Sequence, residues 1–253
     1  MATQWQTFPV PFTGGLITNI SPLQQGINNV GSAFQLQNFE PSLDGGYKKV
    51  AGYTKFIPTV LSGSGAVQAL ALVQHDANEK LIAARNGIYY ITNAVDSSPS
   101  WATLATASNT SFTKARQARY NFNNVYKICF VDGVNFPAYY DRTNNNMTYM
   151  TSSATNDAVE GASHVSVFKS TLFFGVGTEL VFTAPYSSTD LTPANGAGSI
   201  SIGSTITGLI VFRDQLIVFA TDKIMRISGS SSADFTMSAV TEDLGCLSAD
   251  TIQ

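Results

Sequence analysis

Two stretches of the sequence decide the fold: His164-Val-Ser-Val-Phe-Lys-Ser-Thr-Leu-Phe-Phe-Gly-Val-Gly-Thr-Glu-Leu-Val-Phe182 and Gly208-Leu-Ile-Val-Phe-Arg-Asp-Gln-Leu-Ile-Val-Phe-Ala-Thr-Asp-Lys-Ile-Met-Arg226. They align without a gap at an offset of 44 residues, and Lys169 falls over Arg213 in the first turn. A period of this length, built from short apolar strands and turns, is typical of propeller blades or a related β-array.

The same unit occurs four times. The second turn of each unit lies at Asn86, Asp132, Gly177 and Thr221, at spacings of 46, 45 and 44 residues. The sequence therefore predicts an all-β fold of propeller-like repeats of about 45 residues. Each repeat has three clear strands. We expect the fourth strands in the connectors, at residues 101–104, 147–150, 200–202 and 235–237.

The chain divides by composition into residues 1–61, an N-terminal arm or hairpin segment, and residues 62–253, the repeat domain. The first part contains a turn at Glu40–Gly46, where Pro41 fixes one dihedral and the glycines permit positive φ. Two interpretations remain open: a hairpin that packs on the first blade, or an arm that contacts a neighbouring subunit.

The last residues fall where the repeat period places the start of another inner strand, at about residues 251–252. Because a propeller closes by pairing its first and last blades, we expect either that this strand completes an earlier blade or that the natural chain continues. The second alternative is favoured.

Composition restricts the function. Charged residues make up 12% of the 253 residues and the net charge is −3, which disfavours nucleic acid as the main partner. No apolar run is long enough to span a membrane, and no export signal is visible. We therefore expect a soluble chain that is made in a cytoplasm and has a surface of Ser, Thr, Asn, Gln and Gly, as in β-rich virion proteins.

No pattern predicts a catalytic, cofactor or metal site. Ser187–Asp190 and Ser231–Asp234 resemble the aspartate box of glycan-cleaving propellers but lack its Gly and Trp, so we interpret them as Asx-type turns. Asp132–Asn135 and Thr221–Lys223 have too few carboxylates for calcium. We assign structural roles to His75 and His164, and we expect Cys129 and Cys246 to be buried free thiols.

Basic and aromatic residues leave alternatives open. Lys48, Lys49 and Lys55, and Lys114, Arg116 and Arg119, form small clusters that fit solvated strand faces, with an interface or DNA-lining role as the alternative. The pairs Tyr89-Tyr90 and Tyr139-Tyr140 fit core packing between blades. A sugar-binding platform is the alternative for the aromatic residues.

The lead segment Gly14-Gly-Leu-Ile-Thr18, Ala33-Phe-Gln-Leu-Gln-Asn-Phe-Glu-Pro41 and Gly45-Gly-Tyr-Lys-Lys-Val-Ala-Gly-Tyr53 resembles the opening of tail tube and nozzle-type structural proteins of double-stranded DNA bacteriophages. The closing Asp243–Ile252 also resembles a mid-chain piece of such proteins, which are usually longer. The resemblance implies a non-enzymatic virion protein of the tail or neck. Such a protein is made in the host cytoplasm and forms a homo-oligomeric ring, commonly a hexamer.

As a tail or neck component, the ring would line the DNA exit path or stabilise packaged DNA, without sequence-specific contacts. Its partners would be other tail, portal and adaptor proteins. The expected subunit interface consists of residues of the lead segment: Gly14, Gly15, Asn38, Phe39, Glu40, Pro41, Gly45, Gly46, Tyr47, Gly52 and Tyr53. The alternative function is a glycan-binding propeller for adsorption to a host surface. A glycoside hydrolase or lyase would need a close carboxylate pair, which the sequence does not indicate.

Overall fold

The computed structural model describes residues 14–21, 31–33, 35–43, 46–52, 54–74, 79–92, 99–106 and 112–252. They form two compact units, Met1–Phe56 and Ile57–Gln253. The boundary expected from composition, between residues 61 and 62, lies a few residues further along the chain. No helix formed by the described residues is long and apolar enough to cross a membrane.

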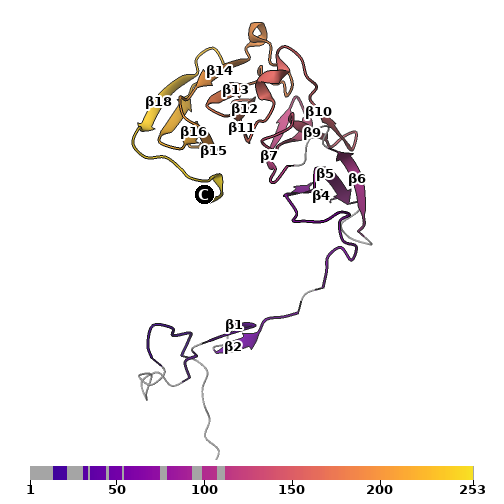
Figure 1. Ribbon diagram of the computed structural model, residues 1–253, viewed down its shortest axis with the longest axis vertical. Coiled ribbons are helices and arrows are strands. Elements are labelled where there is room, and N and C mark those ends of the chain that lie inside the picture. The colour runs from indigo at the N-terminus through magenta and orange to yellow at the C-terminus, as the bar shows by residue number, and fades with distance from the viewer. Residues whose placement is uncertain are drawn as a thin grey trace, which may run out of the picture. The chain divides into compact units, whose positions relative to one another are not determined.

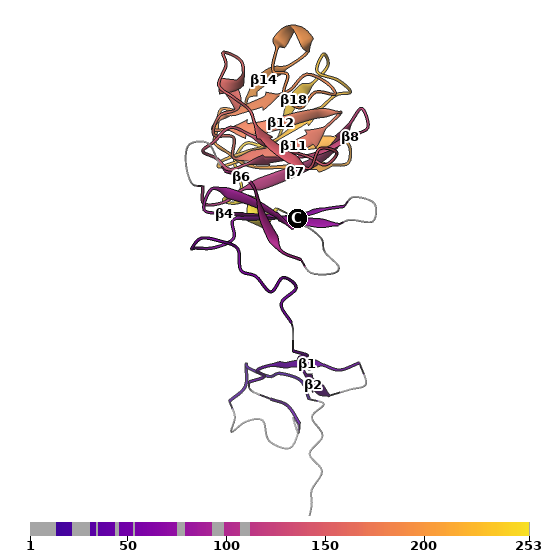
Figure 2. The ribbon, with the colours of Figure 1, turned by 90° about the vertical axis from the view of Figure 1, so that its right-hand side faces the viewer.

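The second unit consists of four antiparallel four-stranded sheets, which we call blades 1 to 4 (Figures 1 and 2). Each blade takes its strands in chain order. The strands of blades 1 and 2 are β3 (Ala69–Val73), β4 (Lys80–Arg85), β5 (Ile88–Thr92), β6 (Trp101–Thr106), β7 (Arg116–Phe122), β8 (Val125–Val131), β9 (Ala138–Asp141) and β10 (Asn146–Tyr149). Those of blades 3 and 4 are β11 (His164–Phe168), β12 (Thr171–Val176), β13 (Glu179–Phe182), β14 (Gly198–Ser201), β15 (Ile206–Phe212), β16 (Gln215–Ala220), β17 (Ile224–Ser228) and β18 (Thr236–Thr241).

The predicted all-β, propeller-like architecture is confirmed. The two aligned stretches form β11–β13 and β15–β17, and each expected fourth strand overlaps β6, β10, β14 or β18. Figure 1 shows the blades along an arc, with the first strand of each blade on the inner side and the fourth on the outer side. The inner strand β11 lies between β7 and β15.

Turn chemistry explains why blades 3 and 4 fold back after their first strands. Lys169 and Ser170 have φ of 49° and 58°, and Arg213 and Asp214 have φ of 46° and 62°. Two successive residues with positive φ make the tight hairpin turn whose twist matches paired strands. The basic turn residue predicted from the alignment also joins two blades, because Lys169 Nζ lies 2.7 Å from an Asp214 carboxylate oxygen.

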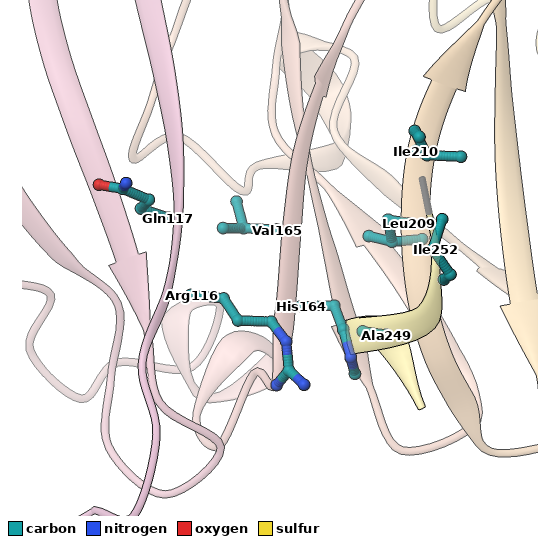
Figure 3. A pocket seen from close by; sticks show the side chains of 8 residues that line it. All are labelled: Arg116, Gln117, His164, Val165, Leu209, Ile210, Ala249 and Ile252. Carbon is teal, nitrogen blue, oxygen red and sulfur yellow. The ribbon is translucent and has the colours of Figure 1, made fainter. Parts of the chain in front are cut away.

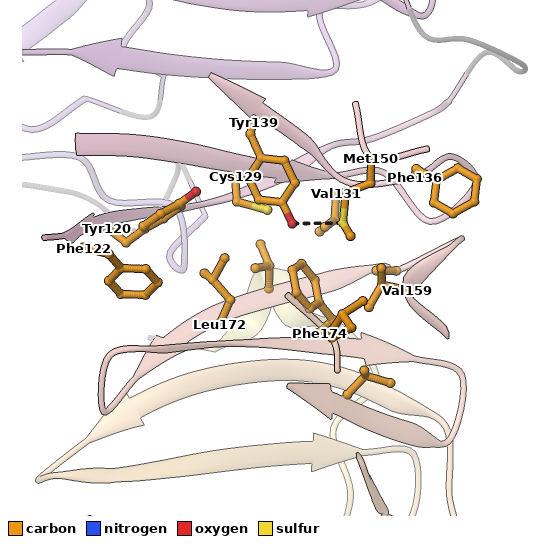
Figure 4. Packing of buried hydrophobic residues seen from close by; sticks show 14 residues of the cluster. Tyr120, Phe122, Cys129, Val131, Phe136, Tyr139, Met150, Val159, Leu172 and Phe174 are labelled. Carbon is orange, nitrogen blue, oxygen red and sulfur yellow. Dashed lines mark hydrogen bonds between the residues drawn. The ribbon is translucent and has the colours of Figure 1, made fainter. Parts of the chain in front are cut away.

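The core is divided into layers between the blades. Blade 1 packs on blade 2 around Ile82, Tyr89 and Phe130, and blade 3 packs on blade 4 around Phe173 and Leu216. Between blades 2 and 3 the layer includes Tyr120, Cys129, Tyr139, Leu172 and Phe174 (Figure 4).

Within the layer between blades 2 and 3, the Tyr139 hydroxyl donates to Met150 Sδ at 3.3 Å. Burying a polar group without a hydrogen-bond partner destabilises the folded state. The bond to Met150 therefore allows the Tyr139 hydroxyl to be buried in this layer. Apolar side chains from both blades make up most of this layer.

The four paired tyrosines are core residues, as their first interpretation predicts. Tyr89, Tyr90, Tyr139 and Tyr140 are all buried. Tyr89 packs against Phe112 and Phe130 at ring-centroid distances of 5.5 and 5.2 Å. A sugar platform built from these four residues is therefore wrong.

Two expectations need correction. Both cysteines are free, but only Cys129 is buried. Cys246 is half-exposed because it follows the outer strand β18, where its N–H donates to the Ala220 carbonyl at 2.8 Å. At the end of the chain, the expected inner strand is replaced by a 3-10 turn, η5 (Ala249–Thr251), in which the Ser248 side chain accepts the Asp250 N–H.

Phenylalanines one repeat apart provide a test of this layering. Phe168 faces blade 4 and is 3% exposed, whereas Phe212 lies 44 residues later and is 57% exposed. We expect Phe168→Ala to lower the free energy of unfolding by about 3–4 kcal/mol and Phe212→Ala by less than about 1 kcal/mol. Urea unfolding of both variants measures the difference, and equal losses would contradict the layered arrangement.

Candidate assembly surfaces

The expected interface residues gather in the first unit around a small hairpin. Strand β1 (Phe39–Pro41) pairs antiparallel with β2 (Tyr47–Lys49), so that Glu40 lies opposite Lys48. Their side chains form an exposed ion pair at 3.2 Å. Such pairs add little stability, so the backbone ladder and the turn define this hairpin.

Residues with positive φ flank the hairpin. Asn38 has φ of 62° and its carbonyl accepts the Val50 N–H at 2.9 Å. Gly46, with φ of 75°, accepts the Ser42 N–H at 3.0 Å. Positive φ is readily available to Gly and tolerated by Asn. Gly45 and Tyr53 lie outside the described residues.

Gly14 and Gly15 let two segments approach closely. Leu16 and Ala33 form a parallel bridge, in which the Ala33 N–H donates to the Gly15 carbonyl at 2.9 Å. A Cβ on Gly14 would lie 2.7 Å from the Ser32 backbone nitrogen. Such a contact forces the backbone to shift, so this position requires glycine. Around Gly52, by contrast, a Cβ would meet no atom within 4 Å.

A cavity of about 330 Å³ in the first unit is lined by Ala33, Gln35, Leu36, Phe39 and Tyr47. The structure thus brings together Phe39 and Tyr47, two residues that the sequence assigned to the interface. Ala33, Gln35 and Leu36 were not assigned, although they belong to the resembling segment. The order of apolar and polar residues from 33 to 39 follows no strict strand alternation, so no simple pattern in the sequence selects these three residues.

A second cluster lies on the inner side of the blades. Figure 3 shows Arg116 and His164, from β7 and β11, pointing the same way beside Ala249 of η5. Lys114 Nζ bonds both carboxylate oxygens of Asp250, and Arg116 Nη2 lies 3.8 Å from one of them. The adjoining cavity measures about 290 Å³. Lys114 and Arg116 therefore form ion pairs with Asp250 of the C-terminal segment.

His164 has a structural setting. It is 7% exposed, and its Nδ1 lies 2.8 Å from Ser163 Oγ. Ser163 Oγ also lies 3.3 Å from the Gly175 carbonyl, on the neighbouring strand. Burial, reinforced by the Arg116 guanidinium, lowers the pKa of His164 to about 4, so the ring is neutral at pH 7. His75 lies outside the described residues.

Side-chain oxygens of the suspected motifs accept backbone N–H groups and close turns. Ser187 Oγ accepts the Asp190 N–H at 3.0 Å, and Asp234 accepts the Ser231 N–H at 2.7 Å. Asp132 accepts the Asn135 N–H at 2.7 Å. The turn role predicted for Ser231–Asp234 is confirmed, and Ser187–Asp190 is also a turn, with the serine hydroxyl as the acceptor. Among the described residues, no group of three or more His, Cys, Asp or Glu side chains gathers where it could hold a metal ion.

Comparisons with known proteins support the fold. No protein-family model and no curated protein matches the sequence. The crystal structure of Saccharomyces cerevisiae Sqt1, a WD40 β-propeller, is similar with a TM-score of 0.51 at 8% identity, over 79% of this chain and 54% of Sqt1. A structural-genomics protein from Bacteroides thetaiotaomicron VPI-5482 has a TM-score of 0.39 at 11% identity, over 67% and 43% of the two chains.

The chain therefore spans about half the length of the solved structures that it resembles. At 8% identity, the likeness to Sqt1 defines a propeller-like fold and carries no function.

Replacement of Gly14 tests the close approach in the first unit. We expect Gly14→Ala to open the bridge at a cost of about 1–3 kcal/mol, because its Cβ meets backbone atoms of Ser32. Hydrogen exchange of the Ile17 and Ala33 amides should accelerate at least about tenfold, while the urea midpoint of the blades stays unchanged. Gly52→Ala is the matched control and should alter neither. Unchanged amide protection in Gly14→Ala would contradict the assignment.

The low pKa of His164 predicts a pH dependence. In the unfolded chain, the His164 ring takes up a proton near pH 6.5. In the folded protein it does so only near pH 4. Stability contributed by neutral His164 is therefore present above pH 6.5 and is lost, by about 2–3 kcal/mol, as pH falls to 4. His164→Gln should reduce the change in the free energy of unfolding between pH 6.5 and 4, measured by urea unfolding at each pH. Asp250→Asn, which removes the ion pair with Lys114 and Arg116, should retain it; equal slopes in wild type and His164→Gln would refute the prediction.

Proposed function

We propose that the chain is a structural protein of the tail or neck of a double-stranded DNA bacteriophage, and that its first unit is an assembly arm. The proposal rests on the resemblance of the lead segment together with one structural observation. Large apolar side chains stand exposed around the hairpin: Leu16 (52%), Phe39 (51%), Leu43 (107%) and Val50 (45%).

The physical argument concerns the size of the hairpin. An isolated two-stranded sheet is marginally stable in water and needs an apolar surface to pack on. Strands β1 and β2 each have three residues, and the neighbouring apolar residues remain in contact with solvent. We propose that a neighbouring subunit supplies the missing surface, so that the arm links copies of the chain into a ring.

The blades would then form the body of the ring. With 12% charged residues and a net charge of −3, such a body would bind phosphates weakly. A conduit through which DNA must pass benefits from weak binding, since strong neutralisation of phosphates retards release. This is consistent with a ring that lines the exit path or stabilises packaged DNA in the virion. Its neighbours would be portal, adaptor or other tail proteins.

Exposed arm residues provide the test. The double variant Phe39→Ser, Leu43→Ser should keep the urea midpoint of the blades, because both side chains are solvent-exposed and substitutions at such sites usually change stability by less than about 0.5 kcal/mol. It should lower the ring fraction of the purified chain at least about tenfold, since each lost apolar contact weakens the docking. Light scattering with negative-stain imaging measures the ring fraction.

Val134→Ser is the matched control, because Val134 is an exposed apolar residue on a blade loop, and it should assemble as wild type does. Wild-type assembly of the arm double variant would contradict the proposal. So would a wild-type chain that stays monomeric both alone and when mixed with a portal–adaptor ring.

A further inference from the structure

Blade 4 has a face that repeats an interface found elsewhere in the chain. Blade 3 contacts blade 4 through Phe168, Phe173 and Leu180. At the offset of 44 residues, blade 4 carries Phe212, Ile217 and Ile224 in the same strand positions. The pairing register is the same in both blades, because Leu180 pairs with Gly175 as Ile224 pairs with Phe219. One position differs: a Cβ on Gly175 would lie 3.0 Å from Ile206 Cγ2 of blade 4, and the terminal face has Phe219 at that position. We call the face formed by Phe212, Ile217, Phe219 and Ile224 the terminal face.

The apolar side chains on blade 3 and those at the equivalent positions on blade 4 differ in their exposure to solvent. Phe168, Phe173 and Leu180 are buried. On the terminal face, Phe212 is exposed, and Ile217, Phe219 and Ile224 are only half-buried. The inner end of the face is covered by the C-terminal segment, where Ile252 contacts Gly208. Phe212 and its three neighbours thus remain in partial contact with solvent side by side, and large apolar patches left exposed on a folded protein mark interaction sites.

The opposite end of the arc differs, because the chain covers it. Leu61 is buried against Ala83 and Tyr90 of blade 1. The Arg85 guanidinium donates to the Leu61 carbonyl at 2.6 Å, and the Tyr90 hydroxyl donates to the Ser62 carbonyl at 3.3 Å. Blade 1 therefore has a strap over its outward face, whereas the terminal face is covered only at its inner end by residues of the described chain.

We propose that the terminal face is the docking site of a further blade, an antiparallel four-stranded sheet that presents alternating Leu, Val and Ala side chains. Continuity with the interface between blades 3 and 4 carries the proposal. There, blade 4 offers Leu216, Val218 and Ala220, and Phe235 inserts among Phe168, Phe173 and Phe182 at centroid distances of 5.4 to 5.9 Å.

The docked blade would place an aromatic ring equivalent to Phe235 on Phe212 and Ile217. At the position equivalent to Phe182 the terminal face has Arg226, whose Nε donates to Ser238 Oγ at 2.8 Å. An arginine can stack its planar guanidinium on an aromatic ring. The aromatic ring of the docked blade would therefore contact Arg226, where Phe235 contacts Phe182 in the interface between blades 3 and 4. The inference concerns blade 4 and stands whether or not the arm forms a ring.

Duplication of one repeat tests the proposal. A second copy of residues 203–246 is inserted after Cys246, which continues the 44-residue period, and Phe212 of the original blade becomes Cys in a Cys246→Ser background. We expect thiol labelling at position 212 to slow at least about tenfold relative to the same chain without the insertion. The urea midpoint should rise as well. The control insertion carries Ser in place of its Leu216, Val218 and Ala220, and it should leave the labelling fast.

Three results would overturn the proposal. The first is unchanged labelling although circular dichroism shows added strand. The second is an inserted copy that stays unfolded beside four intact blades, since the face then fails to dock the blade it is said to fit. The third is concentration-dependent protection of position 212 without the insertion, because a second copy of the chain would then be the occupant.

Discussion

Apolar packing between neighbouring blades is the interaction on which the structure depends. A four-stranded blade with apolar faces cannot bury them by itself, so each blade depends on the neighbour it packs against. Phe173 and Phe174 illustrate the requirement, because successive residues of β12 are both buried, one in the layer toward blade 4 and the other in the layer toward blade 2. The hairpin turns set the register, and burial of apolar side chains in the layers between neighbouring blades holds the blades together.

This dependence also explains how far the fold could be predicted. The period of the apolar strands and turns such as Asn86-Gly87 are local signals, and they place all sixteen blade strands. Cys246 was misassigned because its burial depends on what lies over the segment after β18, which its apolar neighbours in sequence do not reveal. At the position where the repeat period places the start of a terminal strand, Thr251 belongs to η5 and Ile252 has an extended backbone.

The candidate sites were less predictable because they depend on contacts between distant residues. The sequence selected Gly14 on its resemblance alone, whereas its steric role depends on Ser32, reached through a parallel bridge. The inner cluster brings Lys114 and Arg116 next to Asp250, although Lys114 and Asp250 are 136 residues apart in the sequence. No spacing rule connects such residues, so the sequence could propose two basic clusters without identifying their partner.

The scarcity of charge follows from the same architecture. Where blades pack on one another, carboxylates such as Asp190 and Asp141 lie in loops or at the ends of strands. Their oxygens accept backbone N–H groups there: in Asp190 from Thr192 and in Asp141 from Thr143 and Asn144. Bonds of this kind favour the charged form, and the pKa of each of these carboxyls is lowered. The carboxylates of Asp190 and Asp234, in the two segments that resemble an aspartate box, thus accept hydrogen bonds from their own loops in two successive blades.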